Sequence, residues 1–258
     1  MRKTAGYQAP LTSPLDPYLW RIHALAAILA TTSAIAMAST ATTSGSVSLV
    51  TNFPLTNSSK FYRDTAPKHA ATVNISYFAI VFLGLSALQH ALIAVPLWGW
   101  YKNAVAQRCN PLRWAEYSLS ASIMHVLIAS LCGIFDIHLL FAIFGLTATT
   151  MLFGLFAERS DDESVFWLGF IPYATQWLIL ACFFFYAVSK TAGVPDFVWS
   201  IFFVISLLDI SFAVLALLGL RRVGKFADFQ FVELSYAFLS LTSKQFLAWM
   251  TFQGTQRS

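Results

Sequence analysis

Residues 239–249 read LSLTSKQFLAW, which places a single lysine, Lys244, inside a stretch that is otherwise uncharged. The apolar segment around it covers residues 226–253. Six comparable segments precede it, at residues 18–40, 72–98, 111–134, 138–157, 165–189 and 196–220. A hydrocarbon layer about 30 Å thick requires roughly 20 apolar residues per helix. The sequence therefore predicts an all-α membrane protein, in which seven transmembrane helices form a single domain over residues 1–258.

The composition also favours a membrane protein. Of the 258 residues, 57% are hydrophobic, 16% are aromatic and only 11% are charged. Because an average soluble domain is about a quarter charged, no ordinary soluble arrangement is available. The net charge of +4 does not indicate a nucleic-acid partner, since the basic residues fall in short loops between apolar spans. Cys109, Cys132 and Cys182 match neither a metal motif nor a disulfide framework, and no spacing of metal ligands is found.

The distribution of Lys and Arg predicts the orientation. With the N-terminus inside, ten of the 16 basic residues fall in inner segments and five in outer ones, and Lys244 lies within a span. This bias places the N-terminus in the cytoplasm and the C-terminus outside. Residues 1–17 lack the hydrophobic core and cleavage site of a signal peptide, so the first span is expected to remain as an anchor.

One connection, residues 41–71, is much longer than the others. It contains an alternating run at residues 46–51 and a polar-aromatic run at residues 60–63. This pattern predicts a small β-hairpin in the first extracellular loop. A long loop with its own pattern usually has a function, and either capping the bundle or pairing two protomers would provide one. No internal repeat is found, which disfavours a transporter built from inverted halves.

Lys244 is the most informative residue of the chain. Roughly 14 Å of helix separates it from the outer end of its span, so its side chain reaches water with difficulty. Three interpretations remain open: a buried ion-pair partner, a lysine in an aqueous pathway, and an uncharged or covalently modified amine. A desolvated amine is a good nucleophile toward a carbonyl. An aldehyde cofactor would therefore form a Schiff base, which needs one nearby carboxylate when it is protonated.

Glu116 is the matching acid. It lies about five residues into the third span, and Ser120 and Met124 follow on the same helical face. The alternative is an interfacial glutamate hydrated from the cytoplasmic side. His125 lies about 180° around the helix from Glu116, so it is expected to pack against another helix.

Further polar residues lie on the cytoplasmic side of Lys244. Ser240 stands one turn before the lysine and could hydrogen-bond the Schiff base or its counterion. Glu233 lies roughly 16 Å away along the axis, too far for contact but suited to a polar cavity near the inner surface. His23 and His90 fall in the cytoplasmic halves of their spans, where histidines can accept a released proton. A structural role for each histidine remains the alternative.

At residues 113–118 (RWAEYS) and 239–244 (LSLTSK), the chain resembles the heliorhodopsins. The long outer loop, the inside N-terminus and the histidines His23 and His90 extend this resemblance to nearly the whole chain. The sixth-span pattern of other microbial rhodopsins, Trp-x-x-Tyr-Pro, is absent, because Trp199 is followed by SIF. That departure counts against a light-driven pump.

The resemblance implies all-trans retinal, bound as a protonated Schiff base to Lys244 with Glu116 as counterion. It also implies that His23 and His90 form the proton-accepting group. The expected assembly is a homodimer in the lipid bilayer, inverted relative to the familiar pumps and signalling slowly to an unidentified partner. Further residues expected in the retinal site are Ser120, Met124, Met151 and Ser240.

Asp209, in the middle of the sixth span, is not placed by the resemblance. It either bonds a neighbouring helix or lines a proton path, since some viral members of the family conduct protons. Three functions therefore remain: a light-sensing photoreceptor, a light-gated proton channel or transporter, and a retinal-free receptor or scaffold in which Lys244 pairs with an acid. None of the three is an enzyme.

Overall fold

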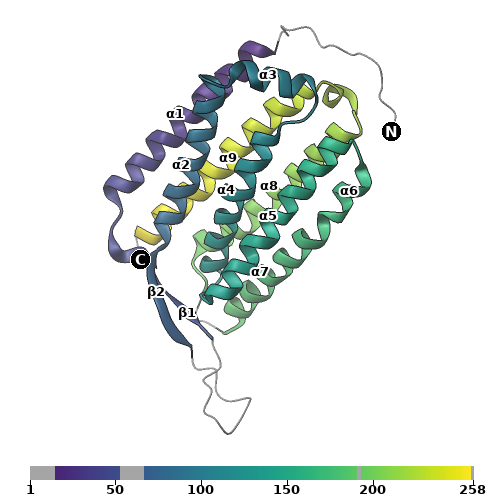
Figure 1. Ribbon diagram of the computed structural model, residues 1–258. Helices are drawn as coiled ribbons and strands as arrows, with labels where there is room; N and C mark the ends of the chain where they lie inside the picture. The colour runs from purple at the N-terminus through teal and green to yellow at the C-terminus, as the bar shows by residue number, and fades with distance from the viewer. Residues whose placement is uncertain (1–14, 53–66, 191–192, 257–258) are drawn as a thin grey trace.

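The computed structural model describes residues 15–52, 67–190 and 193–256 and shows a bundle of long helices (Figure 1). The long helices are α1 (Asp16–Thr40), α2 (Ile75–Ala94), α4 (Pro111–Leu131), α5 (Ile137–Ser160), α7 (Phe170–Lys190), α8 (Asp196–Leu220) and α9 (Phe229–Gln256). The short helices α3 (Trp98–Ala106) and α6 (Glu163–Leu168) lie at the end of the bundle opposite the strands. The predicted seven-helix all-α bundle is confirmed.

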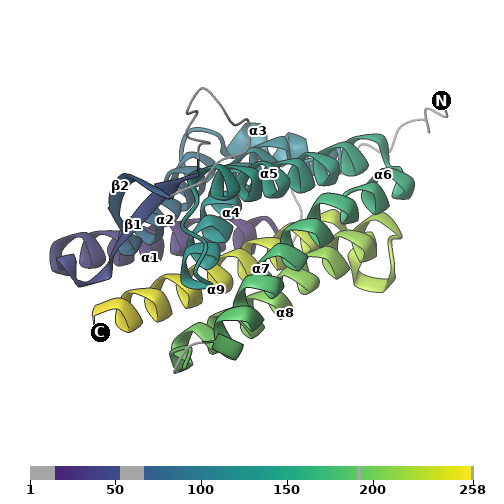
Figure 2. The same cartoon turned by 90° about the horizontal axis from the view of Figure 1, so that it is seen from below.

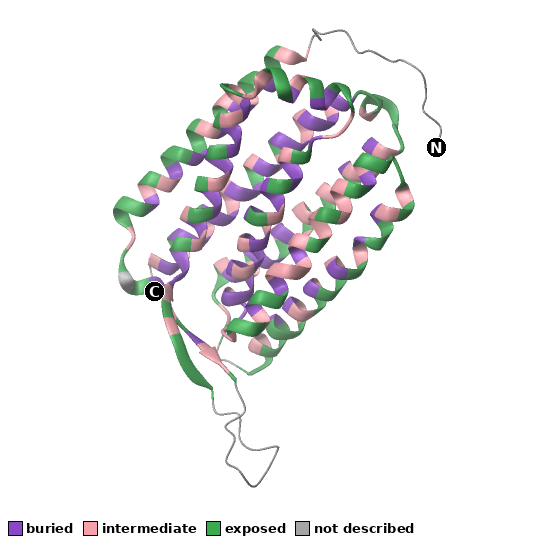
Figure 3. Cartoon of the chain, viewed as in Figure 1, coloured by how far each residue is buried: buried purple, intermediate pink, exposed green. Residues whose placement is uncertain are grey.

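The long helices divide into a lipid-facing group and a central pair. Within the described chain, five segments are long and apolar enough to cross a membrane: α1, α2, α5, α6 with α7, and α8. Large apolar side chains such as Ile28, Phe141 and Leu178 point outward on this group. Helices α4 and α9 are similar in length but more polar, and α9 runs between α1 and α8 (Figure 2). Buried residues concentrate on the inward helix faces (Figure 3).

The second span is shorter than predicted. The expected helix over residues 72–98 is wrong at both ends, because residues 72–74 belong to a strand and the helix stops at Ala94. Asn74 caps α2 by accepting a hydrogen bond from the Ser76 N–H. At the other end stands Pro96, which has no N–H to donate and restricts the residue before it. The chain turns there and continues as α3 across the end of the bundle.

Smaller corrections apply to three other spans. Asn110 caps α4 and Pro111 opens it, but α4 ends at Leu131 because Gly133 adopts a left-handed φ of 91°. The fifth span is interrupted at Gly169, which separates α6 from α7. The last helix begins at Phe229, because the preceding residues form a 3-10 turn, η2 (Gly224–Ala227). The predicted bounds of α8, residues 196–220, are confirmed.

The predicted β-hairpin in the connection over residues 41–71 is present. Strand β1 (Ser46–Thr51) pairs antiparallel with β2 (Lys68–Asn74) and extends from one end of the bundle (Figure 1). The run at residues 60–63 lies outside the described residues, and the second strand is β2. Asn52 donates a hydrogen bond of 2.6 Å to Asp136, which caps α5. The sheet is thereby fixed to the outer end of α5.

Two clusters of buried apolar side chains fill the bundle. The cluster nearer the strands reaches Leu247 on α9 and Met124 on α4. The cluster nearer α3 reaches Leu239 on α9 and Tyr117 on α4. Lys244 therefore stands at the boundary between the clusters, enclosed by protein from both ends. The three cysteines are free, in agreement with the sequence.

Candidate functional site

Lys244 forms a buried ion pair with Glu116. Its Nζ lies 2.6 Å from the Glu116 Oε1 atom, and both side chains are about 5% exposed. The amine also donates a hydrogen bond of 3.3 Å to Ser86 Oγ on α2, and it lies 5.2 Å from the centre of the Tyr117 ring. Helices α9, α4 and α2 thus meet at one nitrogen atom. The amine does not reach lipid or water.

The surroundings of this ion pair contain polar atoms without partners. Among the described residues, the second carboxylate oxygen of Glu116 and the hydroxyl of Ser120 are buried and form no hydrogen bond. Ser120 stands one turn beyond Glu116 on the same face of α4. Because buried polar atoms are normally paired, two such atoms beside Lys244 mark a place where a further polar group or proton can be held.

A cavity lined by Lys244 lies between α4, α5, α7, α8 and α9. It contains about 930 Å³ of atom-free space, a figure that includes open solvent at its mouth. Its wall includes four residues expected from the sequence, namely Ser120, Met124, Met151 and Ser240. Most of the remaining wall is aromatic or aliphatic, including Trp114, Tyr117, Phe170, Phe212 and Tyr236. The cavity is therefore suited to a largely apolar molecule attached at Lys244.

Gly154 is a wall residue that sequence reasoning missed. A Cβ atom at this position would lie 2.3 Å from the ring of Trp114, which is too close for any side chain. The glycine on α5 thus allows the indole of α4 to lie flat against the helix backbone. In the sequence, the glycine at position 154 was the only sign of this close contact.

His23 and His90 are in direct contact. Their Nδ1 atoms are 2.7 Å apart, and both side chains are 3% exposed. His90 stands one turn from Ser86 on α2, about 6 Å along the axis, and Ser86 contacts Lys244. The histidine pair therefore lies one helical turn inward from the lysine nitrogen. Ser86 was missed by the sequence analysis, although its spacing of four residues from His90 was a usable signal.

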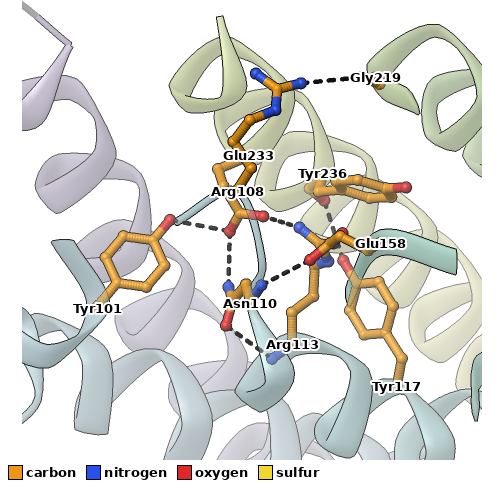
Figure 4. A network of polar contacts seen from close by, with 9 residues as sticks. All are labelled: Tyr101, Arg108, Asn110, Arg113, Tyr117, Glu158, Gly219, Glu233 and Tyr236. Carbon is orange, nitrogen blue, oxygen red and sulfur yellow. Dashed lines mark hydrogen bonds and ion pairs between the residues drawn. The ribbon is translucent and has the colours of Figure 1, made fainter. Parts of the chain in front are cut away.

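Glu233 lies in a separate polar network at the inner end of the bundle (Figure 4). Arg113 on α4 forms ion pairs with Glu233 on α9 and with Glu158 on α5. Asn110 donates to both acids, at 2.7 Å to Glu233 and at 2.6 Å to Glu158. Arg113 is 3% exposed. It is therefore buried inside the bundle, although the tally of basic residues counted it with the cations of the cytoplasmic segments.

Tyr101 connects this network with the histidine pair. Its hydroxyl donates a hydrogen bond of 3.1 Å to Glu233, and its ring packs edge-on against His23 at 4.9 Å. Tyr101 belongs to α3, outside the spans, and burial raises the pKa of its phenol above the ordinary value. It therefore remains a hydrogen-bond donor at physiological pH. Glu233 and His23 do not touch directly.

Asp209 bonds two neighbouring helices. Its Oδ2 atom lies 2.9 Å from Nε2 of His125 on α4 and accepts a hydrogen bond of 3.3 Å from Trp177 on α7. His125 thus packs against another helix, as expected. Asp209 and His125 also form part of the cavity wall that contains Lys244.

A comparison with known families agrees with this geometry. The heliorhodopsin family model matches residues 19–256, nearly the whole chain. The chain belongs to the heliorhodopsin family. No curated protein gives a significant sequence match. Membership of the heliorhodopsin family identifies the chain as an integral membrane protein and a retinal-binding photoreceptor of microbial-rhodopsin type.

The residues present fit the retinal that the heliorhodopsin family implies. Lys244 lines a largely apolar cavity, where its amine could bond an aldehyde carbon. Glu116 supplies a negative charge beside this amine, and the unpaired oxygen atoms of Glu116 and Ser120 supply further polar contacts. The wall beyond them is aromatic and aliphatic, as a polyene requires.

Proposed function

We propose that this protein is a light sensor that carries all-trans retinal as a protonated Schiff base on Lys244, with Glu116 as its counterion. The ion pair of 2.6 Å between Lys244 and Glu116, beside a largely apolar cavity that Lys244 lines, is the observation that carries the proposal. Bound retinal would supply the absorption of visible light and a photoisomerisation. The protein would signal to a partner and would not pump ions or act as an enzyme.

Glu116 would hold the positive charge at the Lys244 nitrogen in the dark. A buried cation is costly without a partner, and one carboxylate at hydrogen-bond distance compensates it. Ser86 and Tyr117 provide additional contacts at the same nitrogen, a hydroxyl oxygen and a ring face. This arrangement fixes the lysine side chain in one direction, toward α2 and α4.

His23 and His90 would accept the proton that leaves the Lys244 nitrogen in the light. Their position one turn inward, beside Ser86, places them on the cytoplasmic side of the counterion. The network of Arg113, Glu158 and Glu233 lies further inward. Because both acids of this network already accept bonds from Arg113 and Asn110, it would leave the proton near the histidines, which suits a sensor better than a pump.

The orientation and assembly form part of the same proposal. The excess of Lys and Arg in the segments at the α3 and α6 end places that end in the cytoplasm, and the β-hairpin outside. The hairpin, fixed to α5 through Asn52 and Asp136, would cap the bundle or pair two protomers in a homodimer. The signalling partner is unknown.

A second function, light-gated proton conduction, is favoured by one observation. Asp209 and His125 line the same cavity as Lys244, so titratable groups exist on the outer side of the lysine as well as on the inner side. Conduction predicts a photocurrent that reverses at the proton equilibrium potential under voltage clamp. A sensor gives no sustained current.

The experiment that tests retinal binding is an absorption spectrum of the purified protein after addition of all-trans retinal, before and after hydroxylamine. We expect a visible band that hydroxylamine bleaches and that Lys244→Ala abolishes. Because that variant leaves Glu116 buried without its partner, Lys244→Ala combined with Glu116→Gln serves as the matched control for folding. A colourless wild-type protein would favour the retinal-free scaffold.

A further inference from the structure

Asp209 is a carboxylate of α8 that has no part in the Lys244 ion pair, yet it faces the same cavity. Its side chain is 18% exposed, whereas that of His125 is 4% exposed. A carboxylate inside a membrane-spanning helix is costly unless it is paired, and such a residue usually has a function.

The contacts of His125 determine how many protons the pair holds. Nδ1 of His125 lies 2.9 Å from the carbonyl oxygen of Ala121. A carbonyl oxygen can only accept, so Nδ1 carries a proton. Nε2 lies 2.9 Å from Oδ2 of Asp209. A bare Nε2 against a bare carboxylate would bring two acceptors together, so one more proton lies between these two atoms.

A further contact favours the histidine as the holder of that proton. The indole N–H of Trp177 donates a hydrogen bond to the same oxygen, Oδ2 of Asp209, that Nε2 of His125 contacts. Hydrogen bonds received by a carboxylate favour its charged form. The titratable groups near it are His125 from α4 and Tyr173 from α7, and Lys244 of α9 lies on the same wall. No other acid occurs among the described residues that line the cavity.

We propose that His125 and Asp209 form an imidazolium–carboxylate pair that acts as a second polar site of the chromophore cavity and sets the wavelength that the protein absorbs. The tuning role rests on the proposed function, in which the cavity holds retinal on Lys244. Among the described groups, the pair is distinct from both the counterion and the His23 and His90 pair.

The position of the pair gives the origin of its effect. His125 stands nine residues beyond Glu116, roughly 14 Å further along α4. Excitation of a protonated retinylidene chromophore moves positive charge away from the nitrogen and along the polyene. The imidazolium and the carboxylate together carry no net charge, but both line the cavity, and their dipole acts differently on the ground state and on the excited state. The ionised pair therefore shifts the absorption relative to an uncharged pair.

The first test compares the spectra of wild type, Asp209→Asn and Asp196→Asn, each reconstituted with all-trans retinal. The amide at position 209 keeps the shape of the side chain and removes the charge of both members of the pair, so we expect the band to shift by on the order of 10 nm. Asp196 is an exposed carboxylate in the first turn of the same helix, away from the cavity. Its amide variant is expected to keep the wild-type spectrum. A coloured Asp209→Asn variant with an unshifted band overturns the tuning role.

The second test uses retinal-free protein and therefore does not depend on the chromophore. Nitrogen NMR of isotope-labelled histidine should show one imidazolium that disappears in His125→Gln and becomes a neutral imidazole in Asp209→Asn. An infrared carboxylic-acid band that Asp209→Asn removes would place the proton on the acid and overturn the ionised pair. If wild type takes up no retinal, the proposed function fails together with the tuning role, and the histidine spectrum still decides whether the pair is ionised.

Discussion

Nδ1 of His23 in α1 and Nδ1 of His90 in α2 lie 2.7 Å apart, so one of the two nitrogens donates a hydrogen bond to the other. Both rings are buried, and the edge of Tyr101 closes one side of His23. Such a pair has one unprotonated outer ring nitrogen, which could take up a further proton while the bond between the rings is kept. Nε2 of His23 is buried and has no hydrogen-bond partner among the described residues.

Replacement of His90 by Phe is expected to reduce proton transfer from the Lys244 nitrogen in the light. The variant keeps a ring in place but removes the acceptor that lies one turn from Ser86. We expect the light-induced near-ultraviolet signal in flash photolysis to fall severalfold. His69→Phe is the control, because His69 lies on exposed strand β2. A full signal in His90→Phe would exclude the pair as acceptor.

Glu116→Gln is expected to change the spectrum strongly. The variant removes the charge that lies 2.6 Å from the Lys244 nitrogen, and the dark state loses more stabilisation than the excited state. The band should move to longer wavelength by on the order of tens of nanometres while the nitrogen keeps its proton. If the nitrogen loses its proton, the band should move to the near ultraviolet. Glu163→Gln, in the exposed pair with Arg221, is the control, and an unchanged spectrum in Glu116→Gln would exclude this acid as counterion.

Gly154→Ala is expected to destabilise the protein and to impair retinal uptake. The added methyl group would lie 2.3 Å from the Trp114 ring, which would have to move into the cavity. Overpacking of this kind costs about 1–3 kcal/mol. Gly145→Ala on the same helix is the matched control, because its added methyl group meets no atom within 4 Å. Detergent unfolding and the rate of colour formation measure both effects, and equal behaviour of the two variants would contradict the close packing.

Arg113→Ala is expected to lower the free energy of unfolding strongly. It leaves Glu158 and Glu233 without the cation that both contact. Removal of one partner from a buried ion pair costs about 3–5 kcal/mol. Arg221→Ala is the control, because its pair with Glu163 is solvent-exposed and should leave thermal stability unchanged. Restoration of stability by adding Glu233→Gln to Arg113→Ala would confirm that unpaired charge is the cause.

The sequence was sufficient to predict the features that follow from runs of apolar residues, and those that follow from the free-energy cost of a charge inside a membrane. The bounds of α8 agree with the apolar run at residues 196–220, because no turn signal interrupts it. The contact between Lys244 and Glu116 could also be anticipated, because a charged acid and a charged amine inside a membrane stabilise each other by pairing. The hairpin was expected from strand β1, whose alternation is visible in the sequence.

The parts that were not predicted depend on tertiary contacts. Pro96 ends α2, yet the surrounding residues are apolar and were assigned to a continuous span. Arg113 follows a proline at the start of α4 and resembles a loop cation, and only the approach of Glu158 and Glu233 from two other helices makes it internal. Gly154 has no pattern around it, since its role comes from an indole on another helix.

The turn at Pro96 has a consequence for communication across the inner surface. Because α3 lies over the end of the bundle, a surface helix contributes Tyr101, which is fully enclosed and touches both His23 and Glu233. A displacement of α3 would therefore move the phenol that contacts both the histidine pair and the acid network. The surface helix and the buried polar groups are coupled through this single side chain.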